Sequence, residues 1–498
     1  MRDVKVSEGA WPENASPRLI NADLAPVPAD RRTWGTYNLF SLWMSDVHSV
    51  GGYAFAAGLF ATGLTGWQVL VGMLAGILAV FGLIHLVGVP SQRLGVPFPV
   101  MARVAFGVFG ANLPALARAI VAIAWYGVQT HFAAVSLKLL LLRVFPSLAP
   151  WAADADGIGG LSWLGWFCYL TLWTLQLLIF RRGMESIRRF TDFAGPAVYV
   201  VMFLVALWMV RRVGFDQIGL SLTDRRLTGI DAGIEMGRVA ALVVGYFAAL
   251  LLNFGDFSRY CPTLGQMVRG NLLGLPLNWM LFALVTVVVT SGTVPLFGEA
   301  ILDPVEIVAR LDSVGLVILG SLTFVLATLG INLVANFVSA AFDLANVSPR
   351  RLSFRTGGLL AAGITLFTFP WHFVRSPQAI AVFVGTIGGF LGPIYGILVV
   401  DYYWVRRGRV LVPDLYREDP AGAFWYRRGW NPRAVAALLP AVSLSAAVAF
   451  IPALEWLGSL NWFFSAGLAA ILYAALNRRH PAATPPPDGI EATRNTSY

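Results

Sequence analysis

Two asparagines lie in one of the most apolar stretches of this sequence, LATLGINLVANF, from Leu326 to Phe337. Asn332 and Asn336 are four residues apart and therefore share one face of a helix. An unpaired carboxamide in an apolar medium costs on the order of 2–7 kcal/mol, so each amide needs a partner. Asn332 could bond a ligand or tie its helix to an interrupted neighbouring helix, and we favour the structural role.

A second pair, Trp125 and Gln129 in IVAIAWYGVQTHF, has the same spacing. An indole face can stack on a flat ring while a carboxamide donates to and accepts from the edge of that ring. The pair therefore suits a planar polar heterocycle. An interfacial tryptophan and a helix–helix hydrogen bond would give the same pattern. For His131, the next polar side chain but one, we favour a packed neutral imidazole.

Two apolar runs carry polar residues and glycines where a continuous helix would need neither. These residues are Asp46, His48, Ser49, Gly51 and Gly52 in the first run and Asn253, Gly255 and Asp256 in the sixth. Interrupted helices at matching places in two halves of a chain are typical of transporters built from inverted repeats. Glycine kinks that allow close helix packing are the alternative.

These residues are embedded in a chain of 498 residues that is 57% hydrophobic and 13% charged, with a mean hydropathy of +0.68. A soluble domain carries roughly 25% charged residues, and one soluble core could not hold so much apolar sequence. The long apolar runs also lack the alternating pattern of barrel strands. We therefore predict an all-α polytopic membrane protein.

A membrane span needs about 20 mostly apolar residues, and the sequence predicts about twelve of them. The predicted spans are residues 36–63, 67–88, 115–143, 161–180, 190–211, 234–257, 271–294, 313–341, 355–371, 378–403, 433–454 and 459–476. Arginines are concentrated in alternate loops, which places both termini in the cytoplasm and the protein in the plasma (inner) membrane. The loop after the fifth span is an exception, because Arg211 and Arg212 would lie outside.

The same distribution limits the partners that the chain could have. The basic residues behind its net charge of +9 fall in alternate loops and do not form one binding face. We therefore expect contact with the lipid bilayer and none with nucleic acid. Arg31 and Arg32 suit a lipid-contact site, but a plain flank of the first span explains them as well. The sequence indicates no protein partner.

Catalytic and metal-binding motifs are missing from the sequence. It has two cysteines, Cys168 and Cys261, and five histidines, without HExxH, GxSxG or CxxC. We therefore expect neither an enzyme nor a cofactor. A channel is also disfavoured, because no filter loop or charged ring is visible.

Five motifs, read together, resemble the nucleobase–cation symporter-1 family from roughly Trp34 to Tyr473. They are VPFPVMARVAFG, WYGVQ, DFSRY, INLVANFVS and GGFLGPIYGILVVDYYWVRRG. The resemblance implies a secondary active transporter with a LeuT-like fold of five-plus-five inverted repeats and broken helices 1 and 6. It also implies import of a small planar nucleobase or related heterocycle, such as uracil, allantoin or hydantoin, by cation symport. The implied segments are an N-terminal segment 1–33, repeats 34–212 and 213–404, a loop with two further spans 405–477, and a disordered tail 478–498.

The resemblance also implies roles for individual residues. Trp125 matches the stacking tryptophan of the family, while Gln129 and Asn336 match the amides that bind the heterocycle. Phe247 matches the second stacking aromatic, where hydantoin-carrying members have tryptophan. Ser49 and Asn332 complete the candidate substrate-binding set.

The coupling cation follows from the same comparison. In sodium-coupled relatives, backbone carbonyls at positions matching Ser45, His48 and Ala327 bind the ion together with two side-chain hydroxyls. Those hydroxyl positions are Gly330 and Ile331 here, so we favour proton coupling over sodium coupling. Intramembrane ionisable groups are usually functional, and the candidate proton carriers are Asp46, His48 and Asp343.

Overall fold

The computed structural model describes residues 11–154, 157–223, 226–374 and 377–478, and this part of the chain is mostly helical and contains no strand. Residues 1–10 of the predicted N-terminal segment lie outside it, as does the predicted tail after residue 478. The prediction of an all-α protein is confirmed.

The first half of the chain forms the helices of the first predicted repeat, and the first of them is interrupted. The helices are α1 (Thr36–Val47), α2 (Val50–Leu59), α3 (Gly66–Leu94), α4 (Phe98–Met101), α5 (Arg103–Phe106), α6 (Asn112–Val144), α7 (Trp163–Phe180) and α8 (Met184–Val213). Helix α8 begins six residues before the predicted span, because Arg188 and Arg189 are paired with Glu185 inside its first turns. These arginines therefore belong to the helix and not to a loop.

The second half contains another interrupted helix and two helices with π-helical segments near their middle. The helices are α9 (Gly229–Tyr246), α10 (Ala248–Asn253), α11 (Gly255–Ser258), α12 (Leu264–Leu272), α13 (Asn278–Phe297), α14 (Pro304–Ala309), α15 (Val314–Ile331), α16 (Val338–Val347), α17 (Phe354–Thr365), α18 (Pro377–Val400), α19 (Pro432–Phe450) and α20 (Asn461–Asn477). The π-helical segments Leu273–Leu277 and Asn332–Phe337 join α12 to α13 and α15 to α16.

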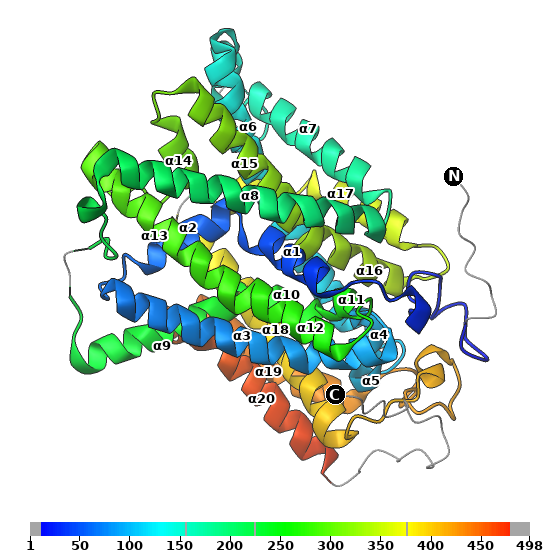
Figure 1. Cartoon of the computed structure of the whole chain (residues 1–498). Helices are drawn as coiled ribbons and strands as arrows, with labels where there is room; N and C mark the ends of the chain where they lie inside the picture. The colour runs from blue at the N-terminus through cyan, green and yellow to red at the C-terminus, as the bar shows by residue number, and fades with distance from the viewer. Residues whose placement is uncertain (1–10, 155–156, 224–225, 375–376, 479–498) are drawn as a thin grey trace.

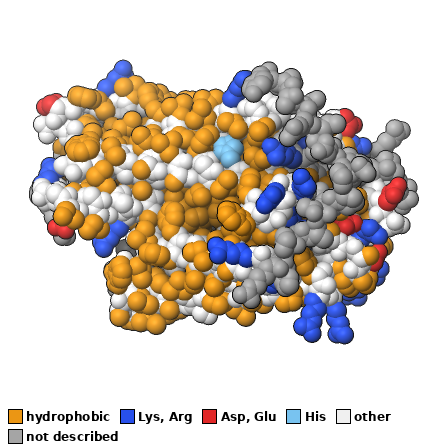
Figure 2. All heavy atoms as spheres, turned by 90° about the horizontal axis from the view of Figure 1, so that it is seen from below, with side chains coloured by type: hydrophobic (Ala, Val, Ile, Leu, Met, Phe, Trp, Pro, Cys, Tyr) orange, Lys and Arg blue, Asp and Glu red, His pale blue; other side chains and the backbone are white. Residues whose placement is uncertain are grey.

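Eight helical stretches in the described residues are long and apolar enough to cross a membrane. The interrupted helices are not among them. Their pieces α1, α2, α10 and α11 are too short to count alone, and α9 has 18 residues but carries Asp231, Glu235 and Arg238. The count of twelve spans and the boundaries of the two repeats stay predictions. Figure 2 shows hydrophobic side chains over most of one face of the bundle, with charged side chains gathered towards its two ends.

The interrupted helices lie inside the bundle. Helix α1 packs along α8 on one side and against α12 on the other, and α6 packs along α15 (Figure 1). Helix α9 packs along α3, and α10 contacts both α3 and α18. This arrangement brings the two interruptions, the middle of α6 and the π-helical segment of Asn332 towards one central region.

The segment before α1 is folded against the loop between α18 and α19. Ser16 donates to Glu418 (3.0 Å), and Tyr416 donates to the carbonyl of Leu24 (2.8 Å). The described beginning of the chain and the loop between α18 and α19 therefore lie at the same end of the bundle, on the right in Figure 1.

Candidate functional site

The first helix is interrupted at His48 and Ser49, whose backbones are extended. Ser49 begins α2, because its hydroxyl accepts a hydrogen bond from the amide of Gly52 (2.9 Å) and so caps the new helix. The glycine pair, which we expected to cause the break, lies in the first turn of α2 instead. A Cβ on Gly52 would lie 2.8 Å from the carbonyl oxygen of Val47 and 2.9 Å from the hydroxyl of Tyr246. Glycine therefore allows close approach here.

The sixth helix is interrupted twice. One interruption, at Phe254, adjoins the predicted Asn253, Gly255 and Asp256. The other is at Phe247, seven residues earlier and two residues after Gly245, a glycine that our reading of the sequence did not single out. Tyr246, beside this second interruption, stacks on Phe55 of α2 with ring centroids 4.8 Å apart. The breaks of the first and sixth helices therefore face each other.

The two asparagines of the π-helical segment are bonded to each other and differ in their further partners. The amide nitrogen of Asn336 donates to the amide oxygen of Asn332 (2.9 Å). The amide nitrogen of Asn332 lies within bonding distance of the carbonyl of Tyr126 (3.1 Å) and the hydroxyl of Thr130 (3.0 Å). It also donates to the amide oxygen of Gln176 (2.6 Å). Asn332 therefore ties the eighth span to α6 and α7, whereas we had expected a broken helix as its partner.

Gln129 lies beside the first interruption. A Cβ on Gly51 would be 3.9 Å from the amide nitrogen of Gln129. The Gln129 side chain is buried, and its amide oxygen has no hydrogen-bond partner in the described part of the chain. Buried polar atoms are rarely left unpaired, so such an atom calls for an explanation. Trp125, one turn earlier on the same face of α6, is partly buried.

Phe247 is enclosed by aromatic rings. It is 1% exposed and meets Trp43, Tyr246 and Trp279 through edge contacts, with centroid distances of 6.3, 5.2 and 5.4 Å. The ring is thus held in a fixed orientation next to the second interruption. The expected pairing of Phe247 with Trp125 around a ligand stays a prediction.

The candidate cation residues come together where α1 meets α15. A Cβ on Gly330 would lie 3.1 Å from the Cβ of Ser45 and 3.4 Å from its carbonyl oxygen. The hydroxyl of Ser45 itself is directed to the carbonyl of Thr191 on α8 (3.4 Å). Ala327 and Ile331, the other two candidates on α15, are buried.

The three candidate proton carriers have different surroundings. The ring of His48 packs between Tyr199 and Phe282, and its Nδ1 bonds the carbonyl of Met44 (2.6 Å). Asp46 and Asp343 are buried, and each has one carboxylate oxygen without a hydrogen-bond partner among the described residues. The other oxygen of Asp343 accepts from Ser339 (3.4 Å).

Arg118 is a functional candidate that our reading of the sequence missed. It is fully buried on α6 and interacts electrostatically with Asp46, Asp256 and Asp343. Its guanidinium donates to the carbonyl of Ala335 (2.6 Å) and to Asn253 (3.3 Å). A charge inside the third predicted span is the signal that could have identified it. Arg118 is therefore buried within electrostatic reach of both candidate aspartates, Asp46 and Asp343, while its hydrogen bonds go to Asn253 and Ala335.

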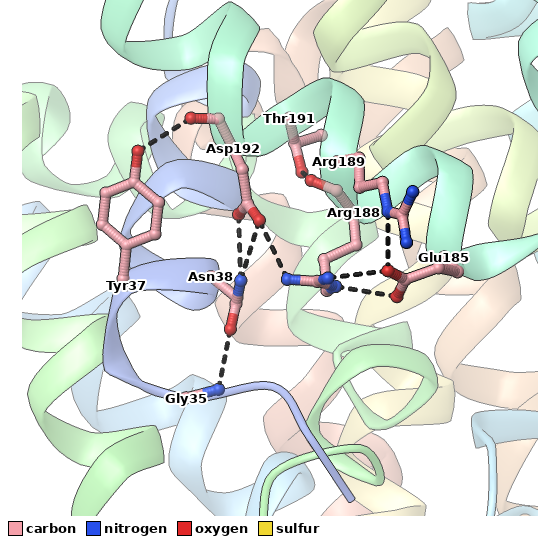
Figure 3. Close-up of polar contacts among 8 residues, drawn as sticks. All are labelled: Gly35, Tyr37, Asn38, Glu185, Arg188, Arg189, Thr191 and Asp192. Carbon is pink, nitrogen blue, oxygen red and sulfur yellow. Dashed lines mark hydrogen bonds and ion pairs between the residues drawn. The ribbon is translucent and has the colours of Figure 1, made fainter.

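Near the beginning of α1, a polar cluster joins this helix to α8 (Figure 3). The amide nitrogen of Asn38 donates to both carboxylate oxygens of Asp192, at 3.0 and 2.9 Å. The hydroxyl of Tyr37 donates to the carbonyl of Asp192 (2.8 Å), and Arg188 pairs with the Asp192 carboxylate (3.1 Å). We call Tyr37, Asn38, Arg188 and Asp192 the α1–α8 latch.

The sequence model of a family described as "Permease for cytosine/purines, uracil, thiamine, allantoin" matches residues 26–465. The chain belongs to the nucleobase–cation symporter-1 family. It is 36% identical to an allantoin permease of Bacillus subtilis, over 95% of this chain and 96% of the relative. The prediction of the family is therefore confirmed.

Solved structures agree on the fold. One is Mhp1, described as a nucleobase-cation-symport-1 family transporter in a closed conformation with bromovinylhydantoin bound. It is 23% identical, has a TM-score of 0.74, and covers 92% of this chain and 95% of its own. A Na⁺-coupled sialic acid symporter, 12% identical with a TM-score of 0.62, covers 95% and 94%. The LeuT-like fold that the sequence predicted is confirmed.

As a symporter-1 family member, the protein is a multi-pass membrane transporter of the nucleobase type, and it is not an enzyme. The family identification indicates a role for the central region where the interrupted helices meet. Interrupted helices supply backbone polar groups at membrane depth, which suits a ligand site in the middle of a transporter.

Proposed function

We propose that the protein imports a small planar heterocycle of the allantoin, uracil or hydantoin class by proton symport. In this proposal it lies in the plasma (inner) membrane with both termini in the cytoplasm. The observation that carries the substrate class is the buried, unpaired amide oxygen of Gln129 beside the interruption of the first helix. An N–H on the edge of a heterocycle would satisfy this oxygen.

The remaining groups fit the same ligand. The nitrogen of the Asn336 amide is held by Asn332, so its oxygen is the atom that would accept a second N–H from the substrate. Trp125 and Phe247 would contact the two faces of the ring, and Ser49 borders the site at the interruption. Asn332 acts as the support of Asn336.

Proton coupling is supported by two features around α15. Gly330 and Ile331 offer no hydroxyl, and three backbone carbonyls alone would make a poor cage for a hard cation such as Na⁺. The Gly330–Ser45 contact is also close, which suits helix packing. Asp46 and Asp343, both buried within electrostatic reach of Arg118, are acids that a proton could neutralise during transport.

Uptake of labelled allantoin, uracil and hydantoin into proteoliposomes would test the proposal. We expect one of them to accumulate in sodium-free buffer when the outside is acidic, and the accumulation to collapse with a protonophore. Uptake that does not depend on the pH gradient and rises steeply with added Na⁺ would show that the coupling ion is sodium and not a proton. Equilibration without accumulation under either gradient would indicate a facilitator.

A further inference from the structure

A cavity of about 1630 Å³ opens at the end of the bundle where the described chain begins. It lies between the segment 22–28, the junction of α7 and α8, the beginning of α17 and the residues that follow α11. None of the candidate substrate or cation residues lines it, so it is separate from the central site.

Basic side chains outnumber acidic ones in the lining of this cavity. The lining contains two acidic residues, Asp23 and Glu185, and six arginines, which are Arg31, Arg181, Arg182, Arg189, Arg259 and Arg355. Both acids are already engaged, since Asp23 accepts from the amide of Phe354 (2.8 Å) and Glu185 pairs with Arg188 and Arg189. Within the described chain only Arg189 of these six is in ion-pair contact with a carboxylate, and the other five, Arg31, Arg181, Arg182, Arg259 and Arg355, are not.

Arg259 is the buried member of this set. It is 2% exposed, and its guanidinium lies over the rings of Tyr260 (4.8 Å) and Phe342 (4.6 Å). One nitrogen, Nη2, donates to the carbonyl of Asp23 (2.9 Å) and to the hydroxyl of Tyr260 (2.7 Å). Its Nε and Nη1 have no partner in the described residues. A buried cation without a paired anion is costly, so an anion in the adjoining cavity would stabilise it.

Two helix N-termini also border the cavity. Gly183 and Met184 begin the 30-residue helix α8, and Ser353 and Phe354 begin the 12-residue helix α17. The positive end of the helix dipole at such termini favours negative charge. At α17 the amides of Phe354 and Thr356 already donate to Asp23 and Ser353. The arginines and the helix N-termini thus both favour a negatively charged ligand in the cavity.

We infer that this cavity binds a phosphate group. Arginine is well suited to phosphate because its planar fork of donors matches the phosphate oxygens. Leu178, Ile179 and Phe190 add an apolar wall where the cavity meets α7 and α8. Basic pockets between membrane helices on the cytoplasmic side bind anionic headgroups. The phosphate would therefore come from an anionic phospholipid such as phosphatidylglycerol, or from free phosphate at the membrane surface.

The test uses the full chain, purified in detergent, and three proteins. The first is the parent, and the second is R181Q/R182Q/R355Q, which removes three exposed cavity arginines that make no side-chain hydrogen bond to another described residue. The third is a matched control, R93Q/R409Q/R427Q, which removes three exposed arginines that do not line the cavity. Thermal unfolding is followed while dioleoyl phosphatidylglycerol, dioleoyl phosphatidylcholine or inorganic phosphate is titrated at constant ionic strength.

We expect phosphatidylglycerol to stabilise the parent and the control more than phosphatidylcholine does. The cavity variant, which lacks three arginines, should need on the order of 100-fold more phosphatidylglycerol for the same shift. If inorganic phosphate alone saturates the parent and phosphatidylglycerol adds nothing over phosphatidylcholine, the ligand is free phosphate. Equal responses of the cavity variant and the control overturn the inference, and so does a parent that responds to neither phosphate source.

Discussion

The amide nitrogen of Asn336 donates a 2.9 Å hydrogen bond to the amide oxygen of Asn332, although the two residues belong to different parts of the site. Asn332 is held by α6 and α7, and both polar atoms of its amide are engaged. Asn336 has its nitrogen fixed by this bond. Asn332 therefore holds the amide of Asn336 in place, and the two asparagines should respond differently to substitution.

Asn332→Ala is expected to lower the stability of the folded protein. It leaves Gln176 and Asn336 without their shared partner inside the bundle, and each unsatisfied group costs about 1–3 kcal/mol. Thermal unfolding in detergent should show a lower midpoint than for Asn336→Ala, which removes one bond only. Equal midpoints for the two variants would contradict the supporting role of Asn332.

Asn336→Ala and Gln129→Ala should weaken substrate binding while the folded protein remains abundant. Each substitution removes one buried amide that is proposed to bond the heterocycle, and a loss of about 1.4 kcal/mol corresponds to about 10-fold in affinity. Tryptophan quenching by the transported heterocycle would give the dissociation constants. Parent-like constants in both variants would place the substrate elsewhere.

Phe247→Leu should weaken binding more than it disturbs folding. The side chain stays apolar, but the aromatic face is lost, and a stacked face contributes about 0.5–1.5 kcal/mol beyond the buried area. Phe106→Leu is a suitable control, since Phe106 is also fully buried but lies on α5 and is not one of the candidate site residues. Should both variants bind as the parent does, Phe247 is an ordinary packing residue.

Asp343→Asn should separate transport from proton coupling. An amide cannot carry the proton, so we expect accumulation driven by a pH gradient to be lost. Exchange of labelled for unlabelled substrate at equal pH should continue, because binding does not require a net proton movement. The exposed Asp231 offers a control as Asp231→Asn. Accumulation at the parent level in Asp343→Asn would remove this residue from the proton path.

Asn38→Ala should loosen the α1–α8 latch, because both hydrogen bonds from α1 to the Asp192 carboxylate are lost. A partly exposed contact of this kind is worth about 1 kcal/mol. The fraction of molecules in which α1 has separated from α8 at this end should therefore rise about 5-fold. The opening can be measured in a protein in which Cys168 and Cys261 have been replaced and a cysteine has been introduced at Ser41 on α1. Faster alkylation of this cysteine would report the opening. Glu185→Gln breaks ion pairs within α8 only, and should leave the alkylation rate unchanged.

The sequence by itself determined the class of the protein, the interruption of the first helix and the choice of Asn332 and Asn336. Apolar run length and an adjacent group of polar residues and glycines are properties of a short segment, so they can be read without knowing what lies beside it. The four-residue spacing of the asparagines likewise fixes a shared helix face. The motifs then led to the family.

Only the tertiary structure decided which neighbours those groups meet. Asn332 bonds residues 206 and 156 positions away, and Arg118 reaches a carbonyl 217 positions away. The rotation of one helix against another sets these pairs, and sequence spacing within a helix carries no information about it. The interruption at Phe247, for which the single Gly245 was too weak a signal, and the arginine-lined cavity arise in the same way, because both depend on packing between distant segments.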